Sequence, residues 1–345
     1  MVNSIITGLD LGSSNIRAAC SRVRPSGEIQ VLALENVSSN GFDSGNVVNF
    51  DAASDDVHNV IKKIERKIRA RIRSVSVVMG GSGIHSLSAG GMIALSKKPR
   101  EIWQADVDRC VKQAGMVHVP SDREVIEKAI LDFYINEGDY VENPLGIYAT
   151  KLGVKLFVVT AEIAKIKNIY KCVEHAGLIL KNMAFSPTAL SASILNKDDH
   201  SVNIAIVDIG SHMASVSFFK MGRINSYRYI YQGSRDIDDQ GATGSFLKKI
   251  GHLFTNARPD KIYITGGGAL KENLLEQAEE VFKVKCELGR VRLKGCLLSP
   301  SDGLIHTSSL GIVIDEGKKH ILRNRLRNPF EKMLSYANSL IEEYL

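Results

Sequence analysis

The chain has 345 residues, enough for about two domains that each bury a substantial core, which excludes a small stapled scaffold. Apolar residues make up 44% and charged residues 24%, a balance typical of globular rather than disordered proteins. The formal net charge of +6 is too small over this length to indicate a nucleic-acid-binding protein. We therefore expect no nucleic acid among its partners.

The compartment is predicted from two features. The sequence contains no uninterrupted apolar stretch of about 18 residues, and Met1 leads into a strand pattern without the charged region and cleavage site of a signal peptide. Its five cysteines are scattered, odd in number and without a C-x-x-C pair, which favours reduced thiols in a cytosol over disulfides or a zinc site. We expect a cytoplasmic protein.

Two segments have the pattern of a three-stranded meander, in which strand-like runs alternate with turn residues. They are predicted over Ser4–Leu9, Ile16–Ser21 and Ile29–Glu35, and again over Val202–Val207, Ala214–Lys220 and Arg223–Tyr231. Two copies of one meander, the second beginning near the middle of the chain, indicate a duplicated α/β architecture. Ligands are expected in the cleft between the two halves.

An amphipathic helix follows the first meander. Its apolar residues have helical spacing, and its opposite face is strongly basic: Val57, Ile61, Ile64, Ile68 and Ile72 against Lys62, Lys63, Arg66, Lys67, Arg69, Arg71 and Arg73. Since no aromatic residues interleave the basic ones, we interpret this face as the solvated side of a domain helix rather than a nucleic-acid or membrane patch.

Residues 85–160 have a pattern of their own and are predicted to form an inserted subdomain. Inside it we predict a helix over Gln104–Gly115 and a strand over Val125–Ile135. From its last strand on, strands and helices alternate as in a βαβ unit. These elements are a strand over Gly153–Thr160, a helix over Ala161–His175, a strand over Leu178–Ala184 and a helix over Thr188–Leu195.

Three short motifs could hold a phosphorylated ligand. In the first meander, Asp10 ends a strand and Gly12, Ser13 and Ser14 form the turn, with Arg17 just beyond. Small residues let backbone N–H groups approach an anion, and an aspartate can hold water on a magnesium ion. A β-turn without a ligand is the alternative for a single copy of this motif.

The second meander repeats the motif, with Asp208, Gly210 and Ser211 at the equivalent place. The third piece is an apolar strand that ends in Gly266, Gly267 and Gly268, a turn on which an adenosine can lie against the backbone at the start of a helix. Catalytic residues remain unknown, because no nucleophile and base have a recognisable spacing. Asp198 and Asp199 are interpreted as a turn.

In that order, these motifs resemble the actin, Hsp70 and sugar-kinase superfold, and within it the FtsA family. The insert carries the resemblance through Glu101-Ile102 with Asp106, Arg123 to Tyr134, Asn143 to Gly146 and Leu152 to Thr160. The segment from Ser186 to Ala192 is similar to FtsA's helix between the two halves, so that the resemblance covers about residues 4–314. PilM, a pilus-assembly scaffold, is the nearest alternative.

The resemblance implies an α/β fold, a duplicated actin/Hsp70-like architecture with an FtsA-type (SHS2-like) inserted subdomain and a reduced second half. The domains are expected at 1–84 and 161–200 for the first half, 85–160 for the insert, 201–317 for the second half, and 318–345 for a basic linker and C-terminal amphipathic helix. ATP and magnesium are implied at the three motifs, with Asp10 and Asp208 holding magnesium through water.

The sequence departs from the FtsA pattern at two places. The second phosphate hairpin of the family usually continues with a glycine and two threonines, where this chain has His212, Met213 and Ala214. Only 55 residues separate Gly210 from Thr265, too few for the family's fourth subdomain, which covers the adenine and carries the groove for the FtsZ tail. We expect weak or vestigial ATP binding, at most a slow ATPase, and no FtsZ binding in the family's usual way.

Residues 318–345 hold six basic and three acidic residues, half of the chain's net charge. After Pro329, apolar residues that include Phe330, Met333, Leu334, Leu340 and Ile341 recur at helical spacing. FtsA-like proteins end in such a membrane-targeting helix, which implies an anionic membrane surface as a partner. The alternative is a helix docked on protein, which the paired Glu342 and Glu343 favour.

The sequence therefore predicts an FtsA-like scaffold at the cytoplasmic face of the cell membrane. It is expected to self-associate through its insert into a polymer and to work with division or related assembly proteins. A PilM-like scaffold for pilus or secretion assembly is one alternative. An active phosphotransferase of the same fold is the other.

Overall fold

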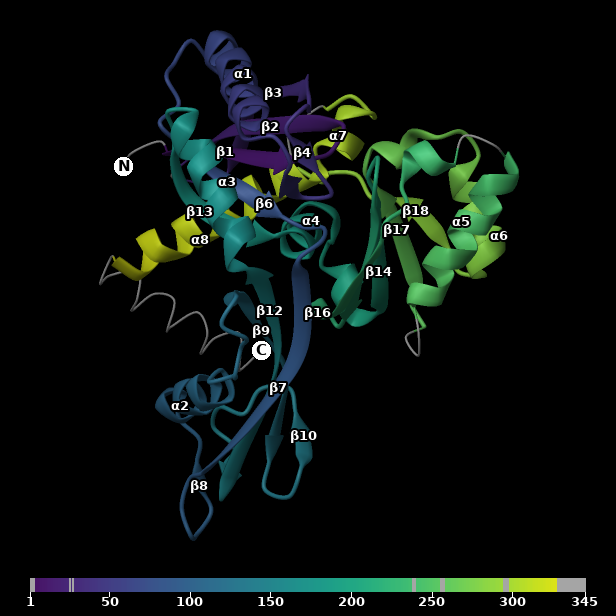
Figure 1. The fold of residues 1–345 in the computed structure, drawn as a ribbon. Coiled ribbons are helices and arrows are strands. Elements are labelled where there is room, and N and C mark those ends of the chain that lie inside the picture. The colour runs from purple at the N-terminus through teal and green to yellow at the C-terminus, as the bar shows by residue number, and fades with distance from the viewer. Residues whose placement is uncertain are drawn as a thin grey trace.

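The structure, a computed structural model, describes residues 4–24, 26, 28–237, 240–254, 258–293 and 298–327. Figure 1 shows two halves side by side, with the insert extending away from both. None of the helices within these ranges is long and apolar enough to cross a membrane. The residues predicted to form the C-terminal amphipathic helix, from Phe330 on, lie outside the described part of the chain.

The first half is built on a five-stranded sheet in the order β13-β6-β1-β2-β3. Antiparallel β1, β2 and β3 form the predicted meander, and β6 and β13 extend it in parallel with β1. The strands are β1 (Ser4–Leu11), β2 (Asn15–Val23), β3 (Ile29–Ser38), β6 (Ser74–Met79) and β13 (Ile179–Phe185), and a small hairpin of β4 (Phe42–Asp43) and β5 (Asn46–Val47) follows β3.

Helices cover both faces of this sheet. One face packs against α1 (Phe50–Ile68) and α3 (Ile163–His175), and the other against α4 (Ser186–Ile194) and α8 (Thr307–Arg327). A Cβ at Gly311 would lie only 1.9 Å from the Ala189 carbonyl oxygen, so the close approach of α8 to α4 requires glycine. The last described helix, α8, and the helix between the halves, α4, therefore form one packed layer.

The second half repeats the first sheet strand for strand, in the order β16-β15-β14-β17-β18. Again three antiparallel strands are extended by two parallel ones: β14 (Asn203–Ile209), β15 (Ala214–Lys220), β16 (Arg223–Ile230), β17 (Lys261–Thr265) and β18 (Cys286–Leu288). Helices α5 (Gln240–Leu253) and α6 (Leu274–Phe282) lie together on it, and α7 (Asp302–Ile305) leads back into α8. The predicted duplication is confirmed.

The insert is an antiparallel sheet in the order β10-β9-β12-β7, with α2 (Gln104–Ala114) packed on β7 and β12. Its strands are β7 (Ile84–Ala94), β9 (Arg123–Ile135), β10 (Asp139–Val141) and β12 (Lys151–Glu162), with a distal pair of β8 (Arg100–Glu101) and β11 (Tyr148–Ala149). Arg100 donates two 2.7 Å hydrogen bonds to the Asp106 carboxylate. These bonds outweigh the opposite effect of burial and lower the pKa of Asp106 to about 2. The insert has a core of its own.

Several predicted boundaries differ from the structure. Helix α1 begins at Phe50, capped by the Asn49 side chain, rather than at Val57, and ends at Ile68 because Arg69 adopts a left-handed backbone conformation. The glycine turn opens a 3-10 turn, η3 (Gly267–Leu270), and not a helix. Residues 318–327 continue α8, where a linker was expected. Asp198 and Asp199 belong to a 3-10 turn, η1 (Asp198–Ser201).

The described residues between Gly210 and Thr265 form β15, β16, a 3-10 turn η2 (Ser234–Asp236) and α5 before β17 begins. Two strands of this set belong to the repeated meander. The segment thus has the reduced size that the sequence spacing predicted.

Candidate functional site

A cavity of about 460 Å³ lies between the two halves, at the ends of β1, β14 and β17. All the residues that the sequence motifs proposed for a nucleotide line it except Gly268: Asp10, Gly12, Ser13, Ser14, Arg17, Asp208, Gly210, Ser211, Gly266 and Gly267. The structure therefore brings the three motifs together, although they lie in distant parts of the sequence.

The first hairpin places Asp10 and Arg17 directly opposite each other on β1 and β2. Their side chains approach to 3.7 Å, and the Arg17 guanidinium also reaches the glycine turn of the second half, where a Cβ on Gly267 would lie 3.5 Å from its Nη2. The Nε of Arg17 is shielded from solvent and has no hydrogen-bond partner among the described residues. An anionic ligand in the cavity would supply one.

The second hairpin is tightly held and differs from the first in its side chains. The carbonyl oxygens of Gly210 and Ser211 accept hydrogen bonds from the backbone N–H groups of Ser234 and Arg235 in η2. His212 reaches across the cavity, with its Nδ1 2.5 Å from an Asp43 carboxylate oxygen in the first half. The Arg235 guanidinium donates to the other ring nitrogen at 2.9 Å, so that Nδ1 carries the proton given to Asp43.

His212 is thus engaged as a bridge between the two halves. Both of its ring nitrogens have protein partners, and neither is left to donate to a phosphate. The bridge joins the second hairpin to the β4–β5 hairpin of the first half.

Asp10 and Asp208 come from equivalent places in the two halves. Burial raises the pKa of Asp10, against the effect of Arg17. Burial and then the neighbouring Asp10 carboxylate raise the pKa of Asp208 to about 7, with Arg17 again opposing. A divalent cation held by the two carboxylates would lower the pKa of both, since it favours their charged forms.

The glycine turn requires glycine at its first position. Gly266 has φ +87°, and a Cβ there would lie 2.4 Å from an Asp208 carboxylate oxygen. Gly268 does not reach the cavity and packs on Ile209 instead, where a Cβ would lie 2.3 Å from the Ile209 side chain. Any side chain at either glycine would displace the second hairpin.

Two buried residues beside the cavity were missed by sequence reasoning. Lys165 donates to the carbonyl oxygens of Gly80 and Ser82 at 2.8 and 2.6 Å, and its burial lowers its pKa to about 8. The Tyr227 hydroxyl, which lines the cavity, accepts from the backbone N–H of Gly81, and burial raises its pKa to about 12. A signal for Lys165 existed, because it shares the apolar face of its helix with Ile169 and Cys172.

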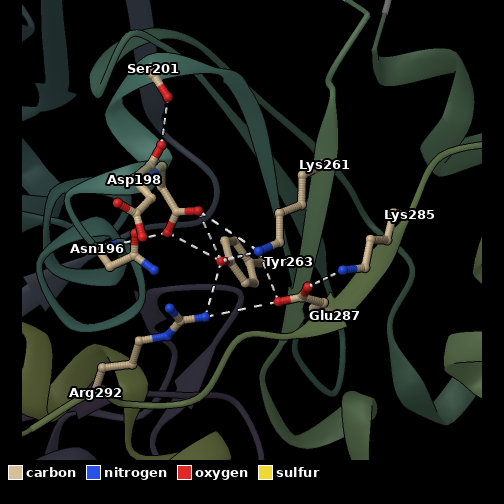
Figure 2. A network of polar contacts seen from close by, with 9 residues as sticks. Asn196, Asp198, Ser201, Lys261, Tyr263, Lys285, Glu287 and Arg292 are labelled. Carbon is tan, nitrogen blue, oxygen red and sulfur yellow. Dashed lines mark hydrogen bonds and ion pairs between the residues drawn. The ribbon is translucent and has the colours of Figure 1, made fainter.

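A polar network fixes the strand that carries the glycine turn (Figure 2). The hydroxyl of Tyr263, a fully buried residue, donates to Asp199 at 3.1 Å and accepts from Lys261 at 2.6 Å and Arg292 at 3.1 Å. Lys261 also pairs with Glu287 at 2.9 Å. The network joins β17 and β18 to η1, which lies on the connection between the halves.

The fold and the cavity define a class, that of actin-like proteins with two related halves around a central cleft. The chain can be superposed on PilM from the PilM-PilN type IV pilus biogenesis complex with a TM-score of 0.63, 14% identity and coverage of 90% of this chain and 98% of PilM. The ethanolamine utilization protein EutJ from Carboxydothermus hydrogenoformans gives a TM-score of 0.53, with 14% identity and coverage of 91% and 90%. These likenesses establish the fold.

Sequence comparisons relate the chain to FtsA. Residues 81–160 match the model of the SHS2 domain inserted in FtsA. The cell division protein FtsA of Pseudomonas aeruginosa is 30% identical over 220 residues, which are 64% of this chain and 52% of that protein. FtsA of Bacillus subtilis is 24% identical over 288 residues, 80% of this chain and 65% of that protein. The chain has the actin-like fold and is similar to FtsA in sequence, and it spans about half the length of the first of these relatives.

Proposed function

We propose that the chain is a scaffold in cell division, or in a related assembly at the cytoplasmic face of the membrane. The observation that carries this proposal is the combination of an FtsA-type insert with the central cavity of an actin-like fold. The relatives that share the insert are cell division proteins by name. We propose the domain boundaries as predicted from the sequence, with the first half at 1–84 and 161–200, the insert at 85–160 and the second half at 201–317.

The cavity is proposed as a weak or vestigial site for ATP with magnesium. Asp10 and Asp208 would hold the metal ion through water, the two hairpins and Arg17 would face the phosphates, and Gly266 and Gly267 would lie under the adenosine. Bound magnesium would neutralise phosphate charge, while the residues of this chain would orient the nucleotide. The bridge from His212 to Asp43 removes donors from one hairpin, so affinity and turnover are expected to be low.

The distal end of the insert is proposed as a self-association surface. Trp103 and Tyr148 are 63% and 66% exposed there, and Leu145, shortly before Tyr148 in the sequence, is 42% exposed. Exposed aromatic side chains at a protruding tip are typical of contact surfaces between proteins. The predicted C-terminal helix is proposed to attach the assembly to anionic lipid, and any link to FtsZ must use a surface other than the family's groove.

A PilM-like role in pilus assembly is the second candidate, because the chain covers 98% of PilM in the superposition but only about half of an FtsA relative. Two experiments in the native organism distinguish the candidate functions: deletion of the gene, and localisation of a fluorescent fusion of the protein. The division scaffold predicts filamentous cells and a fusion at the constriction site. Normal division, with loss of pili or of secretion, would reject it in favour of the second candidate.

A further inference from the structure

The positive charge of the chain is concentrated in one short segment at the end of α1. Residues 62–73 contain seven basic side chains and one acidic one, Glu65. Their net charge, 7 − 1 = +6, equals that of the entire chain. The remaining residues sum to zero, with +3 in residues 318–345 offset elsewhere, so this segment is the more basic of two positively charged regions.

The lysines and the arginines of this segment differ in their contacts. Lys62 pairs with Glu65, Lys67 pairs with Glu35, and Lys63 donates to a backbone carbonyl in β3. The four arginine side chains are exposed and, in the described part of the chain, form no hydrogen bond or ion pair: Arg66, Arg69, Arg71 and Arg73. Guanidinium groups suit phosphate and carboxylate oxygens geometrically, so four such groups form a ready anion-binding surface. We name these four residues the arginine edge.

The backbone at the arginine edge does not favour arginine for stability. Arg69 ends α1 with φ 53° and ψ 39°, a left-handed conformation that glycine adopts without steric cost. An arginine at this position gains nothing locally that glycine would not provide. Its charge is the property that distinguishes it.

The arginine edge lies at the end of the first sheet that is remote from the cavity. Arg73 directly precedes β6, and its carbonyl accepts from the backbone N–H of Ile179, a residue that is 67% exposed at the start of β13. Ser4, at the start of β1, contacts His320 of α8 at 3.1 Å. His320 of α8 therefore lies at the same end of the first sheet as Arg73, since β1 and β6 run parallel from that end.

In place of the solvated face expected from the sequence, we propose that the arginine edge lies on an anionic lipid bilayer, as a second contact beside the C-terminal segment. The inference rests on the proposed membrane association and adds an orientation to it. Asp10 and Ser4 are at opposite ends of β1, so the cavity would face away from the lipid. Lipid fits better than nucleic acid, because the exposed apolar neighbour is Ile179 and no aromatic residue interleaves the arginines for base stacking.

Cosedimentation of the full chain with vesicles of phosphatidylcholine and phosphatidylglycerol tests the proposal. The variant R66Q/R69G/R71Q/R73Q should bind at least tenfold more weakly and with a smaller salt dependence, since each basic residue near the surface contributes about fivefold. The matched control K97Q/K98Q/K151Q/K155Q removes the same charge from exposed positions of the insert and should bind like the parent. The R69G change alone should not lower the unfolding midpoint.

The outcomes separate this proposal from the membrane role of the C-terminal helix. If L334E releases the protein and the arginine variant binds like the parent, the helix anchors the protein and the arginine edge has no part in it. If the lysine control loses as much affinity for the vesicles as the arginine variant does, only net charge determines binding and the proposal is wrong. If the parent does not pellet, both proposals fail. If the arginine variant loses affinity for duplex DNA and keeps its affinity for vesicles, the arginine edge binds nucleic acid and not lipid.

Discussion

At the scale of single residues, two buried groups give the stability of the protein opposite dependences on pH. Asp208 has a pKa of about 7 in the folded protein against an ordinary value of 3.8. The folded state therefore holds this proton more tightly than the unfolded state, and the free energy of unfolding falls as the pH rises from about 4 to 7.

We predict that Asp208→Asn is more stable than the parent at pH 8, by roughly 1–2 kcal/mol, because the cavity admits some water and reduces the cost of the charge. At pH 4 the two should be equally stable. Urea unfolding at the two pH values measures this. A lower stability of Asp208→Asn than of the parent at pH 8 would show that the carboxylate stabilises the empty cavity.

His306, at the junction of α7 and α8, has the opposite effect. It is 1% exposed, and burial with Arg17 nearby lowers its pKa to about 4 from 6.5, so the folded protein keeps it neutral. Stability is then lost as the pH falls from about 6.5 to 4, on the order of 3 kcal/mol. In the parent this slope opposes that of Asp208.

We predict that His306→Gln removes the loss of stability at low pH, so that the free energy of unfolding of this variant decreases steadily from pH 4 to 7. The free energy of unfolding of Asp208→Asn should increase over the same range. Urea titrations of both variants at half-unit intervals measure the two slopes. Parallel pH profiles for the two variants would contradict the assignment of either proton.

At the scale of elements, the Tyr263 network determines how β17 meets the connection between the halves. Replacing Tyr263 by Phe removes the hydroxyl while keeping the ring, and leaves buried Asp199 with fewer partners. We predict a loss of about 1–3 kcal/mol in the free energy of unfolding. Lys285→Ala is the control, since Lys285 is 70% exposed in its pair with Glu287 and should contribute less than about 1 kcal/mol. Equal losses in the two variants would show that the network adds nothing.

The tip of the insert gives a second prediction at this scale. Trp103→Ser with Tyr148→Ser should weaken self-association at least tenfold in sedimentation velocity, since exposed aromatic residues dominate such contacts. Tyr170→Ser, at a 49% exposed position on α3, is the control for losing an aromatic side chain elsewhere. An unchanged association constant for the tip variant would place the contact on another surface.

The sequence predicted those features that depend on neighbouring residues and missed those that depend on residues far apart in the chain. The two meanders and the insert were predicted because alternation and turn residues act locally. The bridge from His212 to Asp43 and the bond from Tyr263 to Asp199 join positions 169 and 64 residues apart, and nothing local marks their partners. Asp199 was interpreted only as part of a turn, and its burial depends on the same distant partner. Of the motif residues only Gly268 lies away from the cavity, because it packs on Ile209 of the second hairpin.

At the scale of the whole molecule, the cavity is formed by both halves and its walls depend on how they meet. The bridge from His212 to Asp43 joins the two halves at the cavity, and α4 packs on strands of both halves. A nucleotide in this cavity would lie beside this bridge. We therefore expect His212 to reduce the affinity for nucleotide more than any other residue of the cavity.

Calorimetric titration of the full chain with ATP and magnesium tests this most directly. We predict a dissociation constant on the order of 10–100 µM or weaker, and about tenfold tighter binding for His212→Gly, which reopens the second hairpin. Asp208→Asn should abolish the effect of magnesium. A submicromolar dissociation constant for the parent, with no improvement in His212→Gly, would contradict the proposal of a weakened nucleotide site.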